Sequence, residues 1–443
     1  MFGTDRTIDK GFTNNPYING ILWSGERLPR NRITYSFINN RNSWGSEGVE
    51  KIEAALDTWE SVADIEFVRV SNNNVFADFQ LKLEDNSYFA SGSANGIALG
   101  KFSAPGEPDQ GEGVFNVDEL GKNVEFSLDP GEEGFKVLIH EFGHGLGLGH
   151  PHDTSGNSST TFPLVTNRDA SDLGLYGLNQ GVWTTMSYNN GYNDRGFEST
   201  PMALDIAAIQ HLYGANEDFA SGDNVYRLSD LESYTAIWDT DGEDTITAIG
   251  VGFGVAANID LRDAPLTGAN AGGYISSATG EDTGLTIANG VEIENATGGL
   301  YHDTLTGNEF ANTLNGNGGN DLLVGLTGSD TLLGGYGDDV LIGVSANTLT
   351  PGRGEYDFLT GGGATDDLFV LGDRNRAFYQ GYGFATITDF DRTEGDKLQV
   401  HGSSKDYTFT DSLGGIDIEY KDDLIGFIEN TTALNPLLDV DYL

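Results

Sequence analysis

HEFGHGLGLGH, residues 140–150, follows an apolar stretch whose pattern predicts a buried helix. His140 and His144 are four residues apart, so on a helix their side chains lie on one face and reach one metal ion. Glu141 stands beside the first histidine, where its carboxylate can take a proton from water activated by the metal and return it to a leaving amine. The stretch therefore predicts a helix that carries a metal-dependent hydrolytic site.

Gly147 ends this predicted helix, because glycine accepts the left-handed backbone conformation in which many helices stop. The turn brings His150 to the same ion from another side. Three histidine ligands leave zinc an open position for water, as catalysis requires. Two other interpretations are a core helix with incidental histidines and a structural zinc site. A structural site is more often closed by a fourth protein ligand, and it has no need of Glu141.

The composition predicts an acidic protein of two or more domains. The chain has 443 residues, with 68 Asp plus Glu against 23 Lys plus Arg and a net charge of -45. Such a surface repels nucleic acid and anionic membranes, and it suits a protein that binds many divalent cations. The absence of cysteine excludes disulfides and thiolate ligands. We expect no membrane span, because no apolar run approaches ~20 residues, and no cleavable N-terminal signal peptide.

Helical patterns occupy the N-terminal half of the chain and disappear after about residue 215. Short strands are expected within residues 17–37, and helices are expected from Ser46, from about Gly134 and over residues 201–214. The expected divisions of the chain are an N-terminal extension or short propeptide at 1–16, a domain with the histidines at 17–215 and a second domain at 216–443.

Residues 298–369 form a nonapeptide repeat. Cut into nines from Gly298, they give eight frames in unbroken register, with Gly at position 1 and Leu at position 8 in seven of them. A flexible glycine-rich linker does not hold such a register, and the pattern is typical of a parallel β-roll in which two frames close one turn. Stacked turns supply calcium with carbonyl and position-6 carboxylate oxygens, so we expect poor folding without calcium. The irregular frame at 343–351 is expected to bind nothing.

Three further motifs accompany the histidine stretch. Pro151 follows the third histidine, WTTMSY occupies residues 183–188, and PMALDIAAIQHLYGAN occupies residues 201–216. Together with the nonapeptides, these motifs resemble the serralysin family of metzincin zinc endopeptidases over nearly the whole chain. The resemblance implies an α+β metzincin catalytic domain followed by an all-β parallel β-roll or β-sandwich domain, with one catalytic zinc ion and several structural calcium ions.

The resemblance also implies roles for single residues. The three histidines of the motif would bind zinc, and Glu141 would be the general base. Tyr188 would be a mobile fifth zinc ligand that stabilises the tetrahedral intermediate, and Met186 would lie beneath the metal as an apolar floor. An edge strand would hold the substrate backbone in antiparallel pairing, with the residues Asn95, Gly96, Ile97, Ala98 and Leu99.

Calcium ligands are expected both before and inside the repeat. SGDNVY at 221–226 and WDTDGEDT at 238–245 resemble family segments that share one ion, and Glu294 resembles the ligand that caps the first roll turn. The expected ligands before the repeat are Gly222, Asn224, Asp239, Asp241, Gly242, Asp244 and Glu294. Those inside it are Gly299, Tyr301, Asp303, Asn312, Gly316, Asn317, Gly318, Gly319, Asp321, Gly325, Thr327, Gly328, Asp330, Gly334, Tyr336, Asp339, Asp357 and Asp366.

The resulting expectation is a secreted, extracellular bacterial endopeptidase that acts on proteins or peptides as a monomer. The chain end, LLDVDYL, partly matches the family signal for a type I secretion apparatus, and a proteinaceous inhibitor is a further expected partner. The competing class is a non-catalytic calcium-binding β-roll protein, such as an adhesin or surface-layer component, and the intact Glu141 weighs against it. His152 lacks ligand spacing and is expected in an exposed loop.

Overall fold

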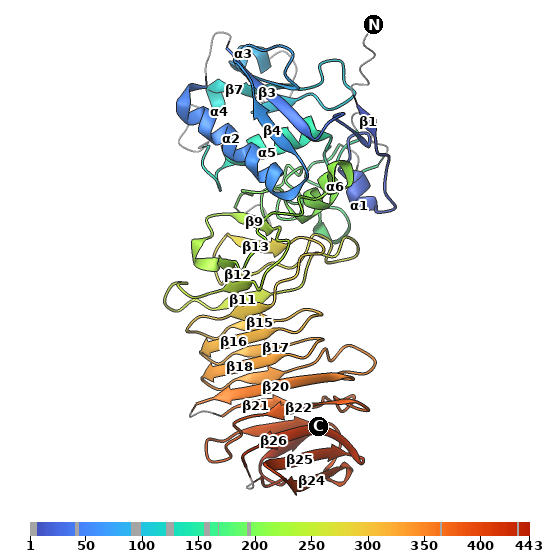
Figure 1. Cartoon of the computed structure of the whole chain (residues 1–443), viewed down its shortest axis with the longest axis vertical. Helices are drawn as coiled ribbons and strands as arrows, with labels where there is room; N and C mark the ends of the chain where they lie inside the picture. The colour runs from blue at the N-terminus through green and yellow to red at the C-terminus, as the bar shows by residue number, and fades with distance from the viewer. Residues whose placement is uncertain are drawn as a thin grey trace.

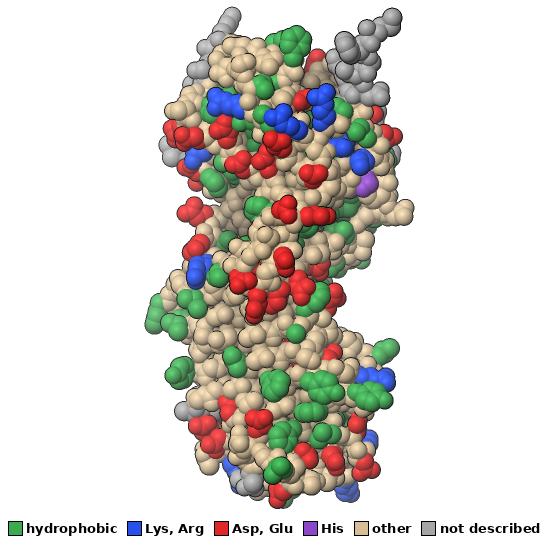
Figure 2. Space-filling view, in the orientation of Figure 1, with side chains coloured by type: hydrophobic (Ala, Val, Ile, Leu, Met, Phe, Trp, Pro, Cys, Tyr) green, Lys and Arg blue, Asp and Glu red, His purple; other side chains and the backbone are tan. Residues whose placement is uncertain are grey.

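The computed structural model describes residues 7–39, 44–89, 99–120, 128–154, 160–166, 168–192, 196–363, 366–431 and 434–443. Helices gather at one end of an elongated molecule, and the strands of the C-terminal half are stacked along its long axis (Figure 1). Within these ranges no helix is long and apolar enough to cross a membrane. Acidic side chains outnumber basic ones on the face shown in Figure 2, in keeping with the net charge of -45.

The N-terminal part mixes helices with short strands. The described helices are α1 (Pro16–Gly20), α2 (Gly45–Val62), α3 (Asn86–Phe89), α4 (Val117–Leu120), α5 (Glu133–Leu146) and α6 (Ala203–Tyr213), with a 3-10 turn at Leu175–Gly177. The strands are β1 (Ile8–Asp9), β2 (Glu26–Arg27), β3 (Arg32–Ile38), β4 (Glu66–Arg69), β5 (Phe79–Glu84), β6 (Gly100–Phe102) and β7 (Glu112–Asn116).

Five of these strands form one sheet in the order β4-β3-β5-β7-β6. β4, β3, β5 and β7 are parallel, whereas β6 runs antiparallel to β7 at the edge. α5 packs against α2, β6 and β7. Trp59 of α2 is fully buried, and its indole N–H donates to the carbonyl of Ile139 in α5 at 3.2 Å. Apolar burial therefore fixes the helix of the histidine motif against the sheet.

Residues 16–20 form the helix α1, where the sequence pattern suggested strands. Oδ1 of Asn15 accepts hydrogen bonds from the backbone N–H groups of Tyr17 and Ile18, at 2.9 and 3.2 Å. Pro16 occupies the first turn, where a missing backbone donor breaks no hydrogen bond of the helix. The strand expectation is wrong for these residues, because an asparagine cap followed by proline starts a helix.

The C-terminal half consists of short strands. They are β8 (Val225–Arg227), β9 (Tyr234–Ile237), β10 (Thr245–Thr247), β11 (Ala257–Asp260), β12 (Ser277–Ala278), β13 (Gly284–Ile287), β14 (Asn295–Thr297), β15 (Thr304–Thr306), β16 (Thr313–Gly318), β17 (Leu322–Val324), β18 (Thr331–Tyr336), β19 (Val340–Ile342), β20 (Glu355–Gly362), β21 (Leu368–Val370), β22 (Gly383–Ile387), β23 (Lys397–Val400), β24 (Tyr407–Ser412), β25 (Gly415–Tyr420), β26 (Asp423–Glu429) and β27 (Val440–Tyr442). Short 3-10 turns lie at Leu228–Asp230 and Ser404–Asp406.

These strands form two large sheets. Their orders are β24-β25-β26-β22-β20-β18-β16-β14-β10-β8 and β12-β11-β15-β17-β19-β21-β23-β27. Consecutive strands of the repeat alternate between the two sheets, and neighbours in one sheet pair in parallel. Six of the seven position-8 leucines are fully buried, namely Leu305, Leu314, Leu323, Leu332, Leu341 and Leu359, whereas Leu368 is partly buried. The prediction of an α+β unit followed by a parallel β-roll is confirmed.

The repeat does not keep one register to its end. In its regular part, hydrogen-bonded aspartates are 18 residues apart, as for Asp321 and Asp339. Asp330 is instead bonded to Asp357, 27 residues further on. The expected frame at 343–351 is therefore not a turn-and-strand unit of its own. It lengthens a single turn that leads from β19 into β20.

A second change shifts the last frame by one residue. The backbone N–H of Asp339 donates to Asp367, 28 residues further on. In the sheet, Leu341 lies opposite Phe369. The expectation of unbroken register is wrong here, and Asp367 occupies the place in the row that the repeat pattern gave to Asp366. The lengthened turn relaxes the nine-residue spacing, so the buried side chains decide the register.

Candidate active site and calcium sites

The helix α5 ends directly after its second histidine. Gly147 has φ 113°, and its N–H donates to the carbonyls of Gly143 and His144, at 3.1 and 3.0 Å. A Cβ added at Gly147 would lie 2.6 Å from the carbonyl oxygen of Glu26. Both the left-handed backbone and the neighbouring strand therefore require glycine at this position. The turn carries the chain back so that His150 faces the helix.

The three histidines converge on one point. Their Nε2 atoms lie 3.1 Å apart for His140 and His144, 3.2 Å for His140 and His150, and 3.0 Å for His144 and His150. Each Nδ1 faces its own acceptor, which is the carbonyl of Thr185 at 2.8 Å, the carbonyl of Leu148 at 2.9 Å and Oδ2 of Asp153 at 3.0 Å. The ring protons therefore belong on Nδ1, and three Nε2 lone pairs point at one another.

This donor set fits a zinc ion. Three facing lone pairs repel one another unless a cation lies between them. A tetrahedral zinc ion with ligands at ~2.0–2.1 Å holds its nitrogens roughly 3.4 Å apart, close to the observed triangle. Burial, followed by the neighbouring histidines, lowers the pKa of His140 well below its ordinary value and lowers the pKa of His144 to about 3. Both rings are neutral imidazoles, the form that binds metal.

Glu141 lies beside this triangle with one free oxygen. Its side chain is buried, and Oε2 has no hydrogen-bond partner among the described residues. Burial raises the pKa of Glu141 to about 8, although the backbone N–H of Phe102 lowers it. A Cβ added at Gly100 would lie 2.9 Å from Cγ of Glu141, so the edge strand β6 passes directly against this carboxylate. A nearby divalent cation favours the ionised form, which can act as a base.

The segment below the metal position is fixed by a buried aspartate that the sequence analysis missed. Oδ1 of Asp205 accepts from the hydroxyl of Thr184 at 2.6 Å, and Oδ2 accepts from the N–H groups of Thr185 and Met202, at 2.6 and 2.9 Å. Thr185 in turn presents its carbonyl to His140. The only sequence clue was an acidic residue near the start of α6, where helices commonly carry one.

Met186 is fully buried next to α5, since a Cβ added at Gly143 would lie 2.6 Å from its sulfur. The side chain of Met186 therefore lies against the turn of α5 that joins His140 to His144. A second buried contact supports the same segment from the other side. Nζ of Lys136 lies 2.8 Å from Oδ1 of Asn190 and 3.5 Å from Oε2 of Glu198. The Met186 segment is thus held both from α5 and from α6.

The ring of Tyr188 stands among the histidines, 5.7 Å from that of His140 and 4.6 Å from that of His150, between centroids. Its side chain is 56% exposed, so it borders the open side of the site. Partial burial of its hydroxyl end, followed by the charge of Glu141, raises the pKa of Tyr188, which keeps the hydroxyl protonated as a donor. His152 is 4% exposed and stacks on His150 at 5.1 Å. The expectation that His152 is an exposed loop residue is wrong.

The predicted substrate strand is described only in part. Asn95, Gly96, Ile97 and Ala98 lie outside the described residues. The carbonyl of Leu99 accepts the N–H of Asn116 at 2.9 Å, so Leu99 continues the pairing of β6 with β7. β6 is an edge strand of the five-stranded sheet. An extended peptide can pair with such an edge.

The position-6 carboxylates of the roll stand in rows, and three of the described ones have one bonded and one free oxygen. Oδ1 of Asp321 accepts the N–H of Asp303 at 2.7 Å, and Oδ1 of Asp339 accepts the N–H of Asp321 at 2.7 Å. Oδ2 has no partner within the described ranges at Asp321, Asp330 and Asp339. Burial raises the pKa of Asp321 to about 7 and that of Asp330 to about 8. Buried free carboxylate oxygens of this kind need a cation.

Glycines let carbonyl oxygens approach these carboxylates. A Cβ added at Gly316 would lie 2.3 Å from Oδ2 of Asp321 and 2.6 Å from the carbonyl oxygen of Gly334. The same arrangement recurs one turn later at Gly334 and Asp339. A carboxylate and a carbonyl that converge where no side chain fits are hard oxygen ligands, as calcium prefers. The repeat therefore fits structural calcium.

The predicted calcium ligands before the repeat also come together. The N–H of Asn224 donates to Oδ1 of Asp244 at 2.8 Å, and the N–H of Asp244 donates to Oε2 of Glu294 at 2.7 Å. Nδ2 of Asn224 lies 3.3 Å from Oδ2 of Asp239. Asp241 is exposed, at the edge of this group.

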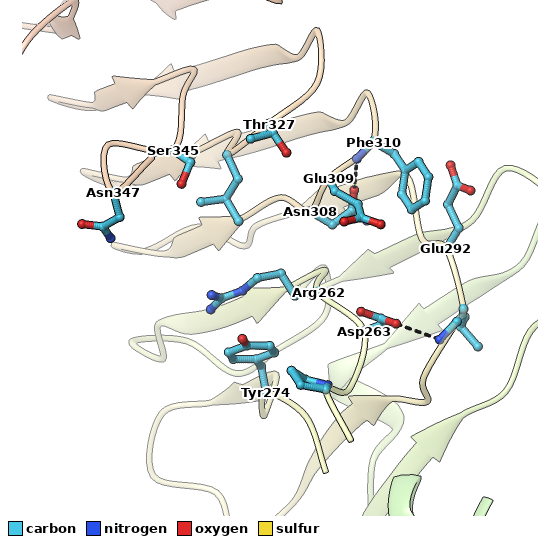
Figure 3. A pocket seen from close by; sticks show the side chains of 14 residues that line it. Arg262, Asp263, Tyr274, Glu292, Asn308, Glu309, Phe310, Thr327, Ser345 and Asn347 are labelled. Carbon is cyan, nitrogen blue, oxygen red and sulfur yellow. Dashed lines mark hydrogen bonds between the residues drawn. The ribbon is translucent and has the colours of Figure 1, made fainter. Parts of the chain in front are cut away.

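A pocket of about 410 Å³ lies on the flank of the roll, away from the histidines (Figure 3). Arg262 stacks over the ring of Tyr274 at 3.6 Å, and Ser345 and Asn347 form the opposite wall. None of the zinc-site residues lines this pocket. Among the predicted calcium ligands, Thr327 does.

Comparison with known proteins finds a peptidase family and a calcium-binding repeat. Residues 26–175 match the matrixin family, and residues 297–332 and 317–347 match the RTX calcium-binding nonapeptide repeat. The chain is 30% identical to Serralysin B of Dickeya chrysanthemi, over 69% of this chain and 64% of that protein. It is 30% identical to Serralysin of Proteus mirabilis, over 62% and 58%. It is 32% identical to Metalloprotease AprA of Pseudomonas entomophila, over 57% and 51%. The chain thus spans less than two thirds of the length of these relatives.

Proposed function

Because this chain is a homologue of the serralysins that combines a matrixin domain with RTX repeats, we propose that it is a calcium-stabilised zinc metalloendopeptidase. Its substrates are proteins or peptides, in which it hydrolyses internal bonds. The observation that carries this proposal is the convergence of three Nε2 lone pairs next to the free carboxylate oxygen of Glu141. We assign the catalytic domain to residues 17–215 and the calcium-binding domain to residues 216–443.

Each side chain of the site has its own part in the proposed hydrolysis. A zinc ion held by His140, His144 and His150 supplies Lewis acidity towards a peptide carbonyl and a water molecule. Glu141 takes the proton of the attacking water on its free Oε2 and passes it to the departing amine. Tyr188 directs its hydroxyl at the oxygen on which negative charge develops. The edge strand β6 pairs with the substrate backbone and holds the scissile bond in front of Glu141.

We propose that the protein acts outside the cell as a monomer. The position-6 carboxylates are buried in rows, so the roll folds where calcium is abundant and stays unfolded where calcium is scarce. An unfolded chain suits export through a type I secretion apparatus, which would read the C-terminal region. A proteinaceous inhibitor that enters the site along β6 is a further proposed partner. Residues 1–16 are then an extension or a short propeptide.

The competing function is a non-catalytic β-roll adhesin or surface-layer protein that retains a peptidase-like domain. Such a protein has no need of a buried base beside the metal position. Nor does it need the hydrogen bonds by which Asp205 fixes Thr184 and Thr185. Burying a carboxylate costs stability, and the placement of His140 through Thr185 is the benefit that offsets it.

The deciding experiment is hydrolysis of casein or a peptide library by the full chain with zinc and calcium bound. We expect cleavage that stops on addition of a zinc chelator and is lost in Glu141→Ala. Mass spectrometry of the peptide products gives the cleavage preference at the same time. A wild-type chain that holds both metals and cleaves nothing would leave the adhesin-type function.

A further inference from the structure

The irregular turn of the roll contains an acidic residue that the repeat pattern does not explain. Four carboxylate oxygens of the roll are buried without a partner in the described part of the chain. Three of them belong to position-6 aspartates. The fourth is Oε2 of Glu355, which stands two residues before Asp357 and is not a position-6 residue. In the regular frames 316–324 and 325–333, position 4 is glycine, and the glutamate stands at that position here.

The turn that carries Glu355 is built differently from its neighbours. A Cβ added at Gly325 would lie 2.2 Å from Oδ2 of Asp330 and 2.5 Å from the carbonyl oxygen of Gly343. Gly343 therefore takes the place of the next position-1 glycine, and the stacked turn runs from Gly343 to Asp357. Ser345 and Asn347 of this turn face the flank pocket (Figure 3). Its middle is thus directed outward, and the tight glycine turn with its inward carbonyls is missing.

Glu355 lies in the row of roll carboxylates, at the place where the carbonyls of a regular turn are missing. The N–H of Tyr356 donates to the hydroxyl of Ser329 at 3.0 Å, so this segment lies against the preceding turn. The N–H of Gly328 is a hydrogen-bond donor to the Glu355 carboxylate. The charge of Glu355 also acts on Asp330. Each of these carboxylates has one buried oxygen without a partner among the described residues, and two such charges on neighbouring turns destabilise each other unless a cation lies between them.

We propose that Glu355 and Asp330 form a calcium site that departs from the repeat pattern, in the gap between the turns Gly325–Asp330 and Gly343–Asp357. Oε2 of Glu355 replaces the carbonyl ligands that the lengthened turn withdraws, and the carbonyl of Gly343 adds a further oxygen ligand. The irregular frame 343–351, which the sequence suggested binds nothing, then supplies a ligand through the carbonyl of Gly343. This inference rests on calcium binding by the repeats and goes beyond the proposed peptidase function.

At the next position of the same carboxylate row, a tyrosine side chain fills the place of a metal ion. Oδ2 of Asp357 accepts the hydroxyl of Tyr379 at 2.5 Å, and Tyr379 is fully buried. A Cβ added at Gly343 would lie 2.2 Å from Oδ2 of Asp357 and 2.3 Å from that hydroxyl. In the regular turns, this place belongs to a carbonyl oxygen of the next turn. The phenol therefore satisfies Asp357 without a metal, and the calcium row ends at Glu355.

The test is the calcium content of the full chain after equilibration at millimolar calcium, measured by inductively coupled plasma mass spectrometry. Glu355→Gln is expected to hold one calcium ion fewer per chain than the wild type, with zinc content unchanged. Glu309→Gln makes the same charge change at an exposed turn and is the matched control, with the full count expected. A wild-type calcium count in Glu355→Gln overturns the site, whatever the chain does to peptides.

Two further variants secure the test. Glu355→Asp keeps a carboxylate on a shorter stem, so it is expected to reach the full count only at a raised calcium concentration. Should Glu355→Gln lose its β-sheet circular dichroism signal, an unchanged calcium midpoint in Glu355→Asp overturns the site. Tyr379→Phe should keep the full calcium count but melt roughly 3 °C lower, because Asp357 is left unpaired. Loss of a calcium ion, or an unchanged melting temperature, overturns the closure by Tyr379.

Discussion

The zinc region and the calcium roll differ in how much of each site the protein stabilises by itself. Each zinc-site imidazole has its own acceptor at Nδ1, and α5 is packed in an apolar core. In the roll, the position-6 carboxylates of Asp321, Asp330 and Asp339 keep a buried oxygen that has no partner among the described residues. The first site is arranged before its metal arrives. The second is an assembly that its metal holds together.

The local architecture explains this difference. α5 is a helix of 14 residues with an apolar face against a five-stranded sheet. A roll strand such as β17 has three residues and buries one leucine, Leu323. Stacked repeats contact only their neighbours, so each turn adds little apolar burial of its own. Ions between the turns must supply the remaining stability.

The largest expected effect is calcium removal. A chelator selective for calcium should abolish most of the β-sheet circular dichroism signal of the roll, because each ion bound at a hundredfold excess over its Kd contributes about 2.7 kcal/mol. Several ions together exceed the whole stability of an ordinary domain. Zinc removal at fixed calcium is the control, and it should leave the far-ultraviolet spectrum nearly unchanged. Equal spectral losses for both metals would contradict the proposed difference.

The next largest effect is expected on the rate of catalysis, with the stability of the fold unchanged. Glu141→Gln keeps the size of the side chain but cannot accept the proton of water. We expect kcat/KM for peptide hydrolysis to fall about 10²- to 10⁴-fold, the usual contribution of a general base. Zinc content and melting temperature should stay at wild-type values, because Glu141 is not a ligand. A large loss of zinc in this variant would mean that the site is less prearranged than its hydrogen bonds imply.

A smaller effect is the pH dependence of the calcium-free roll. Burial raises the pKa of Asp321 from 3.8 to about 7 and that of Asp330 to about 8. These carboxylates take up protons on folding, so the calcium-free roll gains stability as the pH falls below these values and loses it as the pH rises through them. Between pH 8 and pH 5 we expect part of the β-sheet circular dichroism signal that calcium removal abolishes to return, because protonated carboxylates can be buried without the ion.

Calcium should reverse this dependence. Protons compete with the ion for the same oxygens, so the calcium-loaded roll is expected to lose stability as the pH falls. The β-sheet circular dichroism signal at both pH values, recorded with calcium and with a calcium chelator, measures the two slopes. Two slopes of the same sign would show that the free Oδ2 atoms do not face the ions.

The sequence predicts what is local or periodic. The spacing of His140 and His144 specifies a shared helix face, and Gly147 marks the turn. The period of nine specifies the roll as far as residue 342. The apolar residues of the short helix α1 suggest strands, whereas the cap at Asn15 is the local signal that specifies a helix. The slip that brings Asp367 into the row could not be predicted, because it depends on which side chains the neighbouring turns bury.

Contacts between distant segments lie beyond such patterns. Asp205 acts on Thr185, which lies on a loop before it, and Thr185 orients His140. His152 follows the histidine motif, and the sequence there gives no sign that its side chain is buried. The rings that cover it come from the histidine turn and from Tyr188. Tyr379 reaches Asp357 from a segment outside the repeat. In each case the role of the residue depends on a contacting residue that neither the spacing nor the composition of the sequence identifies.

The smallest expected effect separates two glycines of the opening stretch. A Cβ at Gly147 would lie 2.6 Å from a backbone oxygen of Glu26. Gly147 itself has a left-handed backbone conformation, and a change in that conformation or a shift of the strand that contains Glu26 would cost free energy. A Cβ at Gly145 would lie 2.7 Å from a ring carbon of Phe102 and 2.9 Å from one of Phe79, so it would meet side chains of the core rather than the backbone at the turn. Gly147→Ala should therefore weaken zinc binding by about 1–2 kcal/mol, roughly tenfold in Kd. Gly145→Ala should lower the melting temperature while leaving the zinc affinity close to that of the wild type. Competition titration with a zinc chelator measures both affinities. Equal losses for the two variants would show that core packing, rather than the turn to His150, controls the metal site.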